Sequence, residues 1–494
     1  MCGIAGIIGT GDCAREVAVA LQALQHRGQD SSGIGSVCGE EFPLVHKLGL
    51  VGQSYGAEDM AHLPGPLAIG HVRYPTVGRG LLRDAQPFFH RQPGLLMAHN
   101  GNFINVREMQ EVLREDSIHL LSQCDVEPAM CLFALEMMRR RRRDHTLEDA
   151  LAALDATFTR AAGAFSILVA LKLDGIPTLM AVRDPNGIRP LVWGQGNGSF
   201  TVASESVALD AVGAHLEGDV APGEAVFFRR DQEPIRRTWR RGEAAPCIFE
   251  FIYFARPDST MNGRSVYGMR QDLGRELARA WAQKKLSADL VVPIPDTARP
   301  SAAAVAEELH IPFREGFIKN RYSGRTFIMA SPGERQNALR LKLNPIASEF
   351  RDRRVLVVDD SIVRGTTLSR TIHLIREQGP REIHLAIYSP PVLYPCYYGI
   401  DMSTREELAA PRFVESATEG FLSEAEQRRL EHNLAARLGL DSLTYLPGEA
   451  LRRVHPGGCC AACFEGRYPL PVSDERRRWI EEDRRCVVQR ELLF

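Results

Sequence analysis

Three sets of residues in this chain have the types and spacing that chemistry needs. The first is Cys2, which becomes the amino-terminal residue once Met1 is removed. A thiol is a stronger nucleophile at neutral pH than any hydroxyl, and the free α-amino group beside it can act as its base. Cys2 alone does not decide the matter, because a cysteine that merely begins a strand explains it equally well.

The second set is the run Val-Leu-Val-Val-Asp-Asp-Ser-Ile-Val-Arg-Gly-Thr-Thr at residues 355–367. The pattern predicts a buried strand that ends in Asp359 and Asp360, followed by a loop that opens a helix. Backbone N–H groups and hydroxyls at a helix N-terminus bind phosphate, and paired carboxylates suit ribose hydroxyls or hydrated Mg²⁺. The run has neither the Gly-Lys-Ser/Thr of a Walker loop nor the Gly-x-Gly of a dinucleotide fingerprint.

The third set lies among the eleven cysteines of the chain. Cys247, Cys396 and the pair Cys460-x-x-Cys463 offer four thiolates, which suit tetrahedral Zn²⁺ or a [4Fe–4S] cluster. Spacing alone does not choose between the two metals, and the neighbouring Cys459 could replace Cys460. The remaining cysteines other than Cys2 read as small buried apolar residues.

Composition places the chain among ordinary globular proteins. It has 494 residues, a formal net charge of −2, 44% apolar and 25% charged residues. The charge balance argues against a protein that coats nucleic acid, and the arginine run at 139–143 reads as the solvated end of a helix. No apolar run reaches the length of a membrane span, and the amino terminus lacks the basic lead of a signal peptide. We therefore expect no nucleic-acid or membrane partner and a cytoplasmic location.

The elements that must position these residues differ between the two halves. In the first half, short apolar runs at 67–74, 95–98, 165–173, 178–182 and 225–228 predict strands, and 14–24, 106–114, 127–142 and 146–159 predict helices. This order indicates an α+β domain with helices layered on antiparallel sheets.

The second half alternates strand and helix. Strands are predicted at 290–294, 355–358 and 382–388, with helices at 301–309 and 367–378 between them. That alternation is the βαβ pattern of a parallel sheet. We expect domains at 2–230 and 231–470, divided in the charged stretch 229–243, and a charged tail at 471–494.

Four motifs in the first half resemble the class II glutamine amidotransferase domain of the N-terminal-nucleophile family. They are Cys-Gly-Ile-Ala-Gly at 2–6, His-Arg-Gly-Gln-Asp-Ser-Ser-Gly at 26–33, His-Val-Arg-Tyr-Pro-Thr at 71–76 and Ala-His-Asn-Gly-Asn at 98–102. The resemblance implies an αββα sandwich that hydrolyses glutamine through a thioester on Cys2. It also implies that Arg73 holds the glutamine carboxylate, and that the Asn100 side chain and the Gly101 N–H form the oxyanion hole.

The same resemblance assigns the glutamine ammonium to Asp125, although the sequence departs from the family here. The usual Thr-Ser-Asp-x-Glu reads Gln-Cys-Asp-Val-Glu at 123–127, and 77–84 lacks the usual serines. An exposed Asp125 that caps a helix is the alternative.

The run at 355–367 resembles the 5-phosphoribosyl-1-diphosphate (PRPP) signature of type I phosphoribosyltransferases. Matching segments at 293–297 and 317–328 imply that Thr297, Asp359 and Asp360 serve a Mg²⁺–pyrophosphate site and that a mobile segment closes over the substrate. The residues implied to bind PRPP are Lys319, Arg321, Arg325, Ser361, Arg364, Gly365, Thr366 and Thr367.

Together the halves resemble the amidophosphoribosyltransferase family over residues 2–470, in its iron–sulfur-bearing branch. That resemblance implies ammonia transfer from glutamine to PRPP, the entry step of purine synthesis, in a homotetramer inhibited by purine nucleotides. It implies a [4Fe–4S] cluster on Cys247, Cys396, Cys460 and Cys463, with zinc as the alternative. The competing hypotheses are an amidotransferase with another phosphoribosyl or sugar-phosphate acceptor, and a non-catalytic PRPP or nucleotide sensor.

Overall fold

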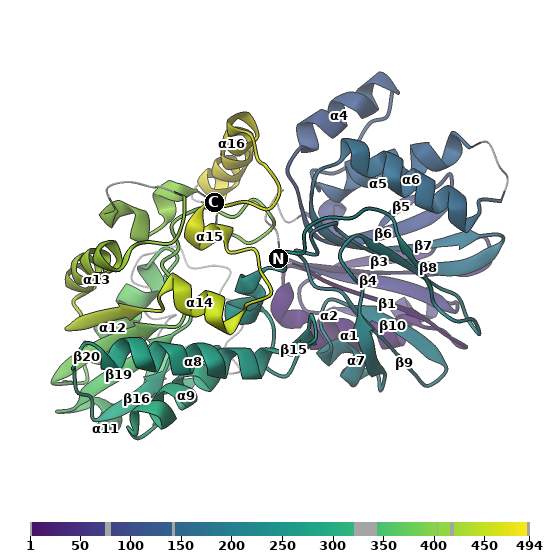
Figure 1. Ribbon diagram of the computed structural model, residues 1–494. Helices are drawn as coiled ribbons and strands as arrows, with labels where there is room; N and C mark the ends of the chain where they lie inside the picture. Colours follow the sequence, from purple (N-terminus) through teal and green to yellow (C-terminus); the bar gives the residue numbers. More distant parts are fainter. Residues whose placement is uncertain are drawn as a thin grey trace.

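The computed structural model describes residues 2–74, 81–140, 144–320, 343–402, 404–414 and 419–491 (Figure 1). In this part of the chain, the first half forms two antiparallel sheets, ordered β11-β9-β10-β1-β4-β2-β3 and β13-β12-β8-β7-β6-β5. The first sheet contains β1 (Gly3–Ile8), β2 (Ser31–Val37), β3 (Leu44–Leu48), β4 (Leu67–Arg73), β9 (Val192–Gly196), β10 (Ser199–Ala203) and β11 (His215–Asp219). The second contains β5 (Phe88–His90), β6 (Leu95–Phe103), β7 (Gly163–Leu173), β8 (Ile176–Arg183), β12 (Glu224–Phe228) and β13 (Ile235–Thr238).

Helices cover the outer face of each sheet, which confirms the predicted αββα sandwich (Figure 1). The first sheet carries α1 (Ala14–Ala23) and α7 (Val207–Ala211), and the second carries α4 (Val106–Glu115), α5 (Val126–Met138) and α6 (Leu147–Arg160). Short helices α2 (Val51–Ser54) and α3 (Ala57–Ala61) follow β3.

Strand β1 shows why the sandwich forms. Ile4 and Ile8 pack in the core between the two sheets, whereas Ala5 and Ile7 pack under α1. Alternate side chains of a strand point to opposite faces, so a strand that is buried on both faces is apolar throughout. This central strand carries Cys2 immediately before its first residue.

The hairpin of β12 and β13 bears on the expected division at residue 230. Strand β13 pairs antiparallel with β12, with Glu224 opposite Thr238. A division at residue 230 would separate two hydrogen-bonded strands, so we place it after Thr238. This position still lies within the charged stretch 229–243, where the division was expected, and β13 is an edge strand with mostly exposed residues.

The second half contains a parallel sheet ordered β16-β19-β20-β21, as the alternation predicts. Its strands are β16 (Leu290–Pro293), β19 (Arg354–Asp359), β20 (Glu382–Ile387) and β21 (Ser442–Tyr445). In β19, Leu356 and Val358 face the core shared with α8 (Val266–Ala282) and α9 (Arg299–Leu309). Val355 and Val357 face α12 (Thr366–Arg376) and α13 (Glu424–Leu438). Smaller elements are β14 (Thr260–Met261), β15 (Arg264–Ser265), β17 (Phe317–Lys319), β18 (Leu343–Pro345), α11 (Ala347–Phe350), α14 (Gly448–Val454) and α15 (Ala462–Glu465).

A buried ionic network joins the two halves. Arg27 contacts Glu205 and also donates to Glu250 at 2.9 Å, and all three side chains are almost fully buried. The carboxylate of Glu250 lies 3.2 Å from Arg189, whose guanidinium donates to the carbonyl of Tyr398. Removing one partner from such a network leaves a buried charge unpaired, so the network holds the halves in one arrangement.

The expected C-terminal tail contains helix α16 (Asp474–Glu491). Arg476 on this helix binds both carboxylate oxygens of Glu108 on α4, at 2.8 and 2.7 Å. The first turn of α16 therefore contacts the first domain. Among the described residues, no helix combines the length and the apolar character that a membrane span requires.

Candidate active site

The first candidate site lies where β1 begins, beside the end of β6. The backbone nitrogen of Cys2 lies 3.4 Å from Oδ1 of Asn100, and its Sγ lies 3.8 Å from the carbonyl oxygen of Tyr74. Asn100 is 1% exposed, and among the described residues its Nδ2 has no hydrogen-bond partner. Because a buried amide donor without a partner is costly, this geometry suits an acceptor that arrives with the substrate.

Gly101 is required by the close approach of two strands. A Cβ at this position would lie 2.1 Å from the carbonyl oxygen of Ala164 on β7. Any larger residue would therefore push β6 away from β7 and move Asn100 with it. The structure thus places Cys2 beside Asn100 and Gly101.

Arg73 is the last residue of β4 and is 3% exposed. The next residue, Tyr74, contacts Cys2 through its carbonyl oxygen. Nη1 of Arg73 lies 3.5 Å from Oδ2 of Asp84, which is also buried. Asp84 in turn accepts from the backbone N–H of Gln123 at 3.2 Å. Asp84 therefore connects the arginine to the loop that precedes α5, a role that no local sequence signal indicated.

Asp125 precedes α5 but does not cap it, since its side chain makes no capping hydrogen bond and is 6% exposed. Its Oδ2 accepts from the N–H of Phe103 at 3.0 Å and lies 3.3 Å from Nε2 of His99. Burial alone would raise the pKa of Asp125, but His99 and these hydrogen bonds hold it below its ordinary value. The carboxyl group is therefore a buried anion, unlike the exposed cap considered above.

A polar cluster behind these residues was missed by sequence reasoning. Gln86 contacts His99 and the thiol of Cys124, while His71 is fully buried and faces the same interior. Burial, with help from His99 and Arg73, lowers the pKa of His71 well below its ordinary value. His71, His99 and Cys124 stand in or beside the amidotransferase-like motifs, but only the fold shows that they share one interior.

The second candidate site lies at the carboxyl end of the parallel sheet. Asp359 is the last residue of β19 and accepts from the N–H of Asp360, whose carboxylate accepts from the Ser361 hydroxyl at 2.6 Å. Burial and the adjacent carboxylate raise the pKa of Asp359, and burial raises that of Asp360. Two crowded carboxyl groups of this kind fit a divalent cation or a pair of ribose hydroxyls.

The loop after these carboxylates ends at an open helix N-terminus. Gly365 precedes α12 with φ of 78°, in the left-handed region that glycine tolerates, and no side chain among the described residues caps the helix there. Thr366 and Thr367 form the first turn, where free N–H groups attract an anion. Arg364, however, points elsewhere, since its Nε donates to Glu407 at 2.9 Å.

The loop after β16 brings further predicted residues to this edge. Ile294 donates to the carbonyl of Val358, and Thr297 lies in the turn that follows. Lys319, at the end of β17, places Nζ 2.7 Å from Oδ2 of Asp296. Arg321 and Arg325 lie outside the described residues.

One carboxylate connects the surroundings of the two sites. The hydroxyl of Tyr74 lies 3.5 Å from Oδ2 of Asp401, and Arg364 of the second site lies 3.9 Å from Oδ1 of the same residue. The two sites therefore share a boundary within one chain.

The four predicted cluster cysteines lie in one core between the domains, and each is at most 9% exposed. The backbones of Cys247 and Cys460 form an isolated parallel β-bridge. The carbonyl of Cys463 accepts from the N–H groups of Leu393 and Tyr394. Burial raises the pKa of the Cys247 thiol to about 12. Within the described residues, no group of His, Cys, Asp or Glu side chains surrounds a common point as metal ligands do.

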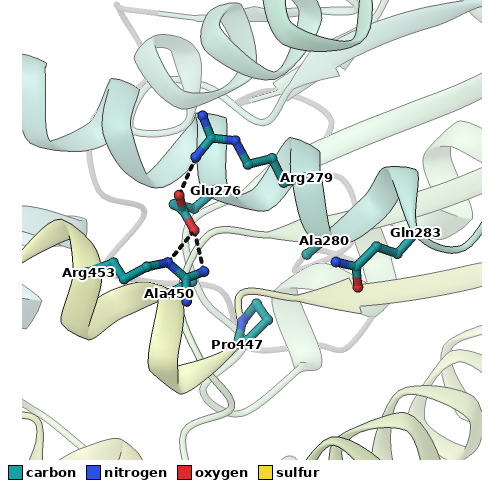
Figure 2. Close-up of a pocket in the computed structure, with 7 residues that line it drawn as sticks. All are labelled: Glu276, Arg279, Ala280, Gln283, Pro447, Ala450 and Arg453. Atoms are coloured by element: carbon teal, nitrogen blue, oxygen red, sulfur yellow. Dashed lines mark hydrogen bonds and ion pairs between the residues drawn. The ribbon is translucent and has the colours of Figure 1, made fainter.

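A pocket of about 270 Å³ lies away from both sites, between α8 and α14 (Figure 2). Glu276 stands between Arg279 and Arg453 in its wall, at 2.5 Å from each guanidinium. Arg279 and Arg453 are both paired with Glu276, so neither arginine lining the pocket is an unpaired cation. None of the predicted site residues lines it.

Two family models match the chain in the order expected from the fold. A glutamine amidotransferase domain matches residues 79–211, and a phosphoribosyl transferase domain matches residues 270–389. Two solved structures are similar over nearly the whole chain, each at 33% identity. One, described as the allosteric regulatory enzyme of purine biosynthesis, has a TM-score of 0.83 and covers 96% of this chain and 97% of its own. The other, the B. subtilis glutamine PRPP amidotransferase complexed with ADP and GMP, has a TM-score of 0.82, with 96% and 98% covered.

Curated relatives agree with this assignment. The amidophosphoribosyltransferase of Methanothermobacter thermautotrophicus is 39% identical over 484 residues, which span 96% of this chain and 95% of that protein. The Escherichia coli amidophosphoribosyltransferase is 42% identical over 423 residues, 83% of each chain. With both domain matches and relatives of this coverage in agreement, the chain belongs to the amidophosphoribosyltransferase family.

Proposed function

We propose that Cys2 is the nucleophile of the glutamine half-reaction, with its own α-amino group as base. Attack on the glutamine amide forms a tetrahedral intermediate, whose collapse gives a glutamyl thioester and ammonia; water then releases glutamate. The unpartnered Nδ2 of Asn100, beside Cys2, is the observation that carries this proposal. Together with the Gly101 N–H it would bind the oxyanion.

Arg73 and Asp125 would bind the two ends of the glutamine backbone. A guanidinium matches a carboxylate through two parallel hydrogen bonds, and Asp84 orients that of Arg73. The buried carboxylate of Asp125 would pair with the ammonium, and His99 keeps it ionised. The Arg73 guanidinium and the Asp125 carboxylate are both buried near Cys2. They would therefore select a substrate that carries a carboxylate and an ammonium group.

At the second site, we propose that the loop of Ser361, Gly365, Thr366 and Thr367 binds the 5-phosphate of PRPP at the N-terminus of α12. Asp359 and Asp360 would hold the ribose hydroxyls and Mg²⁺ with Thr297, and bound Mg²⁺ would neutralise the leaving pyrophosphate. Lys319 would add a cation there, as would Arg321 and Arg325. Arg364 would act mainly through Glu407 and Asp401, which it already contacts.

The four buried thiols suit a [4Fe–4S] cluster by their chemistry, and we propose this cluster with zinc as the alternative. Arg189 lies near these thiols and pairs with Glu250. Burial would lower its pKa, but the thiol of Cys247 and the carboxylate of Glu250 raise it. Iron and acid-labile sulfide in about equal amounts would support the cluster, whereas zinc without sulfide would refute it.

Two further properties are proposed from the family alone. We expect a homotetramer, which light scattering on the purified protein would test. Purine nucleotides are expected to inhibit, in line with a solved relative that was complexed with ADP and GMP. Inhibition should be measured with AMP, ADP and GMP against both glutamine-dependent and ammonia-dependent activity.

The catalytic assignment is tested by Cys2→Ala. The variant should lose PRPP-dependent glutamate release but keep pyrophosphate release when ammonia is supplied, because the second site needs no thiol. Loss of both activities in a folded protein would refute the division of roles.

A further inference from the structure

Asp296 bridges two cations at the edge of the second site. Its Oδ2 lies 2.7 Å from Nζ of Lys319, and its Oδ1 lies 2.6 Å from Nη1 of Arg299. The two cations come from different elements, since Lys319 ends β17 and Arg299 begins α9. One carboxylate therefore ties a strand to a helix across the loop that follows β16.

The loop that carries this bridge begins beside the strand that leads to the paired carboxylates of the second site. Ile294, two residues before Asp296, donates to Val358 on the strand that ends in Asp359. The side chain of Asp296 is 53% exposed and that of Lys319 is 49% exposed, so both ends of the pair are open to a ligand. Ion pairs of this exposure are weak and can exchange partners.

The two cations differ in how firmly they are held. Arg299 also binds Glu315, with Nε 3.0 Å from Oε1. It therefore keeps a carboxylate partner if its ion pair with Asp296 breaks. Among the described residues, the ion-pair partner of Lys319 is Asp296. A diphosphate arriving at this edge would compete with Asp296 for the Lys319 ammonium.

We propose that Asp296 is a positioning residue whose carboxylate holds Lys319 in the free enzyme and exchanges with the diphosphate, so that it weakens the binding of PRPP and of product pyrophosphate alike. The proposal rests on the proposed role of Lys319 in diphosphate binding. By keeping a competing anion at the site, Asp296 would favour release of pyrophosphate after each turnover.

The test compares Asp296→Asn with wild type and with Asp296→Glu, which keeps the charge. The probe is inorganic pyrophosphate in the presence of Mg²⁺, measured by calorimetry and as a product inhibitor of the ammonia-dependent reaction. For Asp296→Asn we expect the pyrophosphate Kd to fall about three- to fivefold, as expected for one exposed charge pair. The KM for PRPP should fall in the same direction, and Asp296→Glu should resemble wild type.

Glu315→Gln provides the matched control, because it removes a carboxylate from Arg299 without touching the Lys319 contact. It should shift the pyrophosphate Kd by less than about twofold. An equal shift in both variants would show a bulk charge effect and overturn the proposal. A higher or unchanged Kd in Asp296→Asn would overturn it as well.

Lys319→Met separates this inference from the function on which it rests. If this variant weakens pyrophosphate binding while Asp296→Asn leaves it unchanged, the role of Lys319 stands and only the exchange is refuted. If Lys319→Met leaves pyrophosphate and PRPP binding unchanged, the assignment of Lys319 itself is wrong.

Discussion

Replacing Asn100 by alanine should slow glutamine hydrolysis far more than the use of free ammonia. In the free protein the Nδ2 of Asn100 is buried and, among the described residues, unpartnered, while Oδ1 faces the nitrogen of Cys2 at 3.4 Å. Leaving a donor in that state costs about 1–3 kcal/mol. A tetrahedral oxyanion beside Cys2 would recover that cost, so the interaction favours the transition state over the ground state.

The expected size follows from that difference. Removing one preorganised oxyanion donor typically costs about 2.7–4 kcal/mol, which corresponds to about 10²–10³ in kcat. The kcat for PRPP-dependent glutamate release should fall by this factor in Asn100→Ala. Ammonia-dependent pyrophosphate release should change by less than about twofold, because Asn100 lies on β6, in the other domain.

Asn102→Ala is the matched control, since Asn102 is also buried on β6 but its Nδ2 already donates to the Tyr397 carbonyl at 2.8 Å. We expect this variant to lower the thermal midpoint and to reduce glutamate release by less than about tenfold. The oxyanion argument would be refuted if Asn100→Ala lost less than tenfold, or lost both activities equally while remaining folded.

Three further predictions concern the framework of the first site. Gly101→Ala should abolish glutamate release and keep ammonia-dependent activity, because its Cβ would lie 2.1 Å from the Ala164 carbonyl; an active variant in the glutaminase assay would contradict this packing. Glu205→Gln should lower stability by about 3–5 kcal/mol in urea unfolding, since Arg27 would remain buried with a partner lost, and a change below 1 kcal/mol would contradict that view. Burial lowers the pKa of His71 in the folded protein. Below the ordinary pKa of histidine, the His71 side chain therefore binds a proton in the unfolded chain but not in the folded one. The free energy of unfolding should therefore fall as the pH drops from 7 to 5, by up to about 1.4 kcal/mol per pH unit for this group. His71→Gln should flatten the plot of urea midpoint against pH. An unchanged slope of that plot would refute the assignment.

The sequence predicted what depends on local pattern. The motif at 355–367 contains its own strand, loop and helix start, and the structure has β19 ending at Asp359 and α12 beginning at Thr366. The strands of the first half and the parallel sheet of the second are confirmed, because short apolar runs and βαβ order are local patterns. The αββα sandwich, which the family resemblance implied, is confirmed as well. The relatives also agree with PRPP rather than a sugar phosphate as the acceptor.

Features that depend on distant partners could not be read in this way. Whether Asp125 is an exposed cap or a buried anion is decided by His99 and Phe103, which lie more than twenty residues earlier. Arg364 lies within the best motif, yet Glu407 determines where it points. Helix α16 was missed because its sequence is strongly charged, and the contact that orders it, Arg476 with Glu108, spans 368 residues.

The central claim is that one chain hydrolyses glutamine at Cys2 and delivers the ammonia to PRPP at the second site. The most direct measurement is the transfer of label from [amide-¹⁵N]glutamine to phosphoribosylamine, with unlabelled ammonium in the buffer and glutamate and pyrophosphate counted together. We predict one pyrophosphate per glutamate and product nitrogen that is almost entirely ¹⁵N. Product nitrogen that follows the ammonium in the buffer, or glutamate release that does not depend on PRPP, would contradict the account.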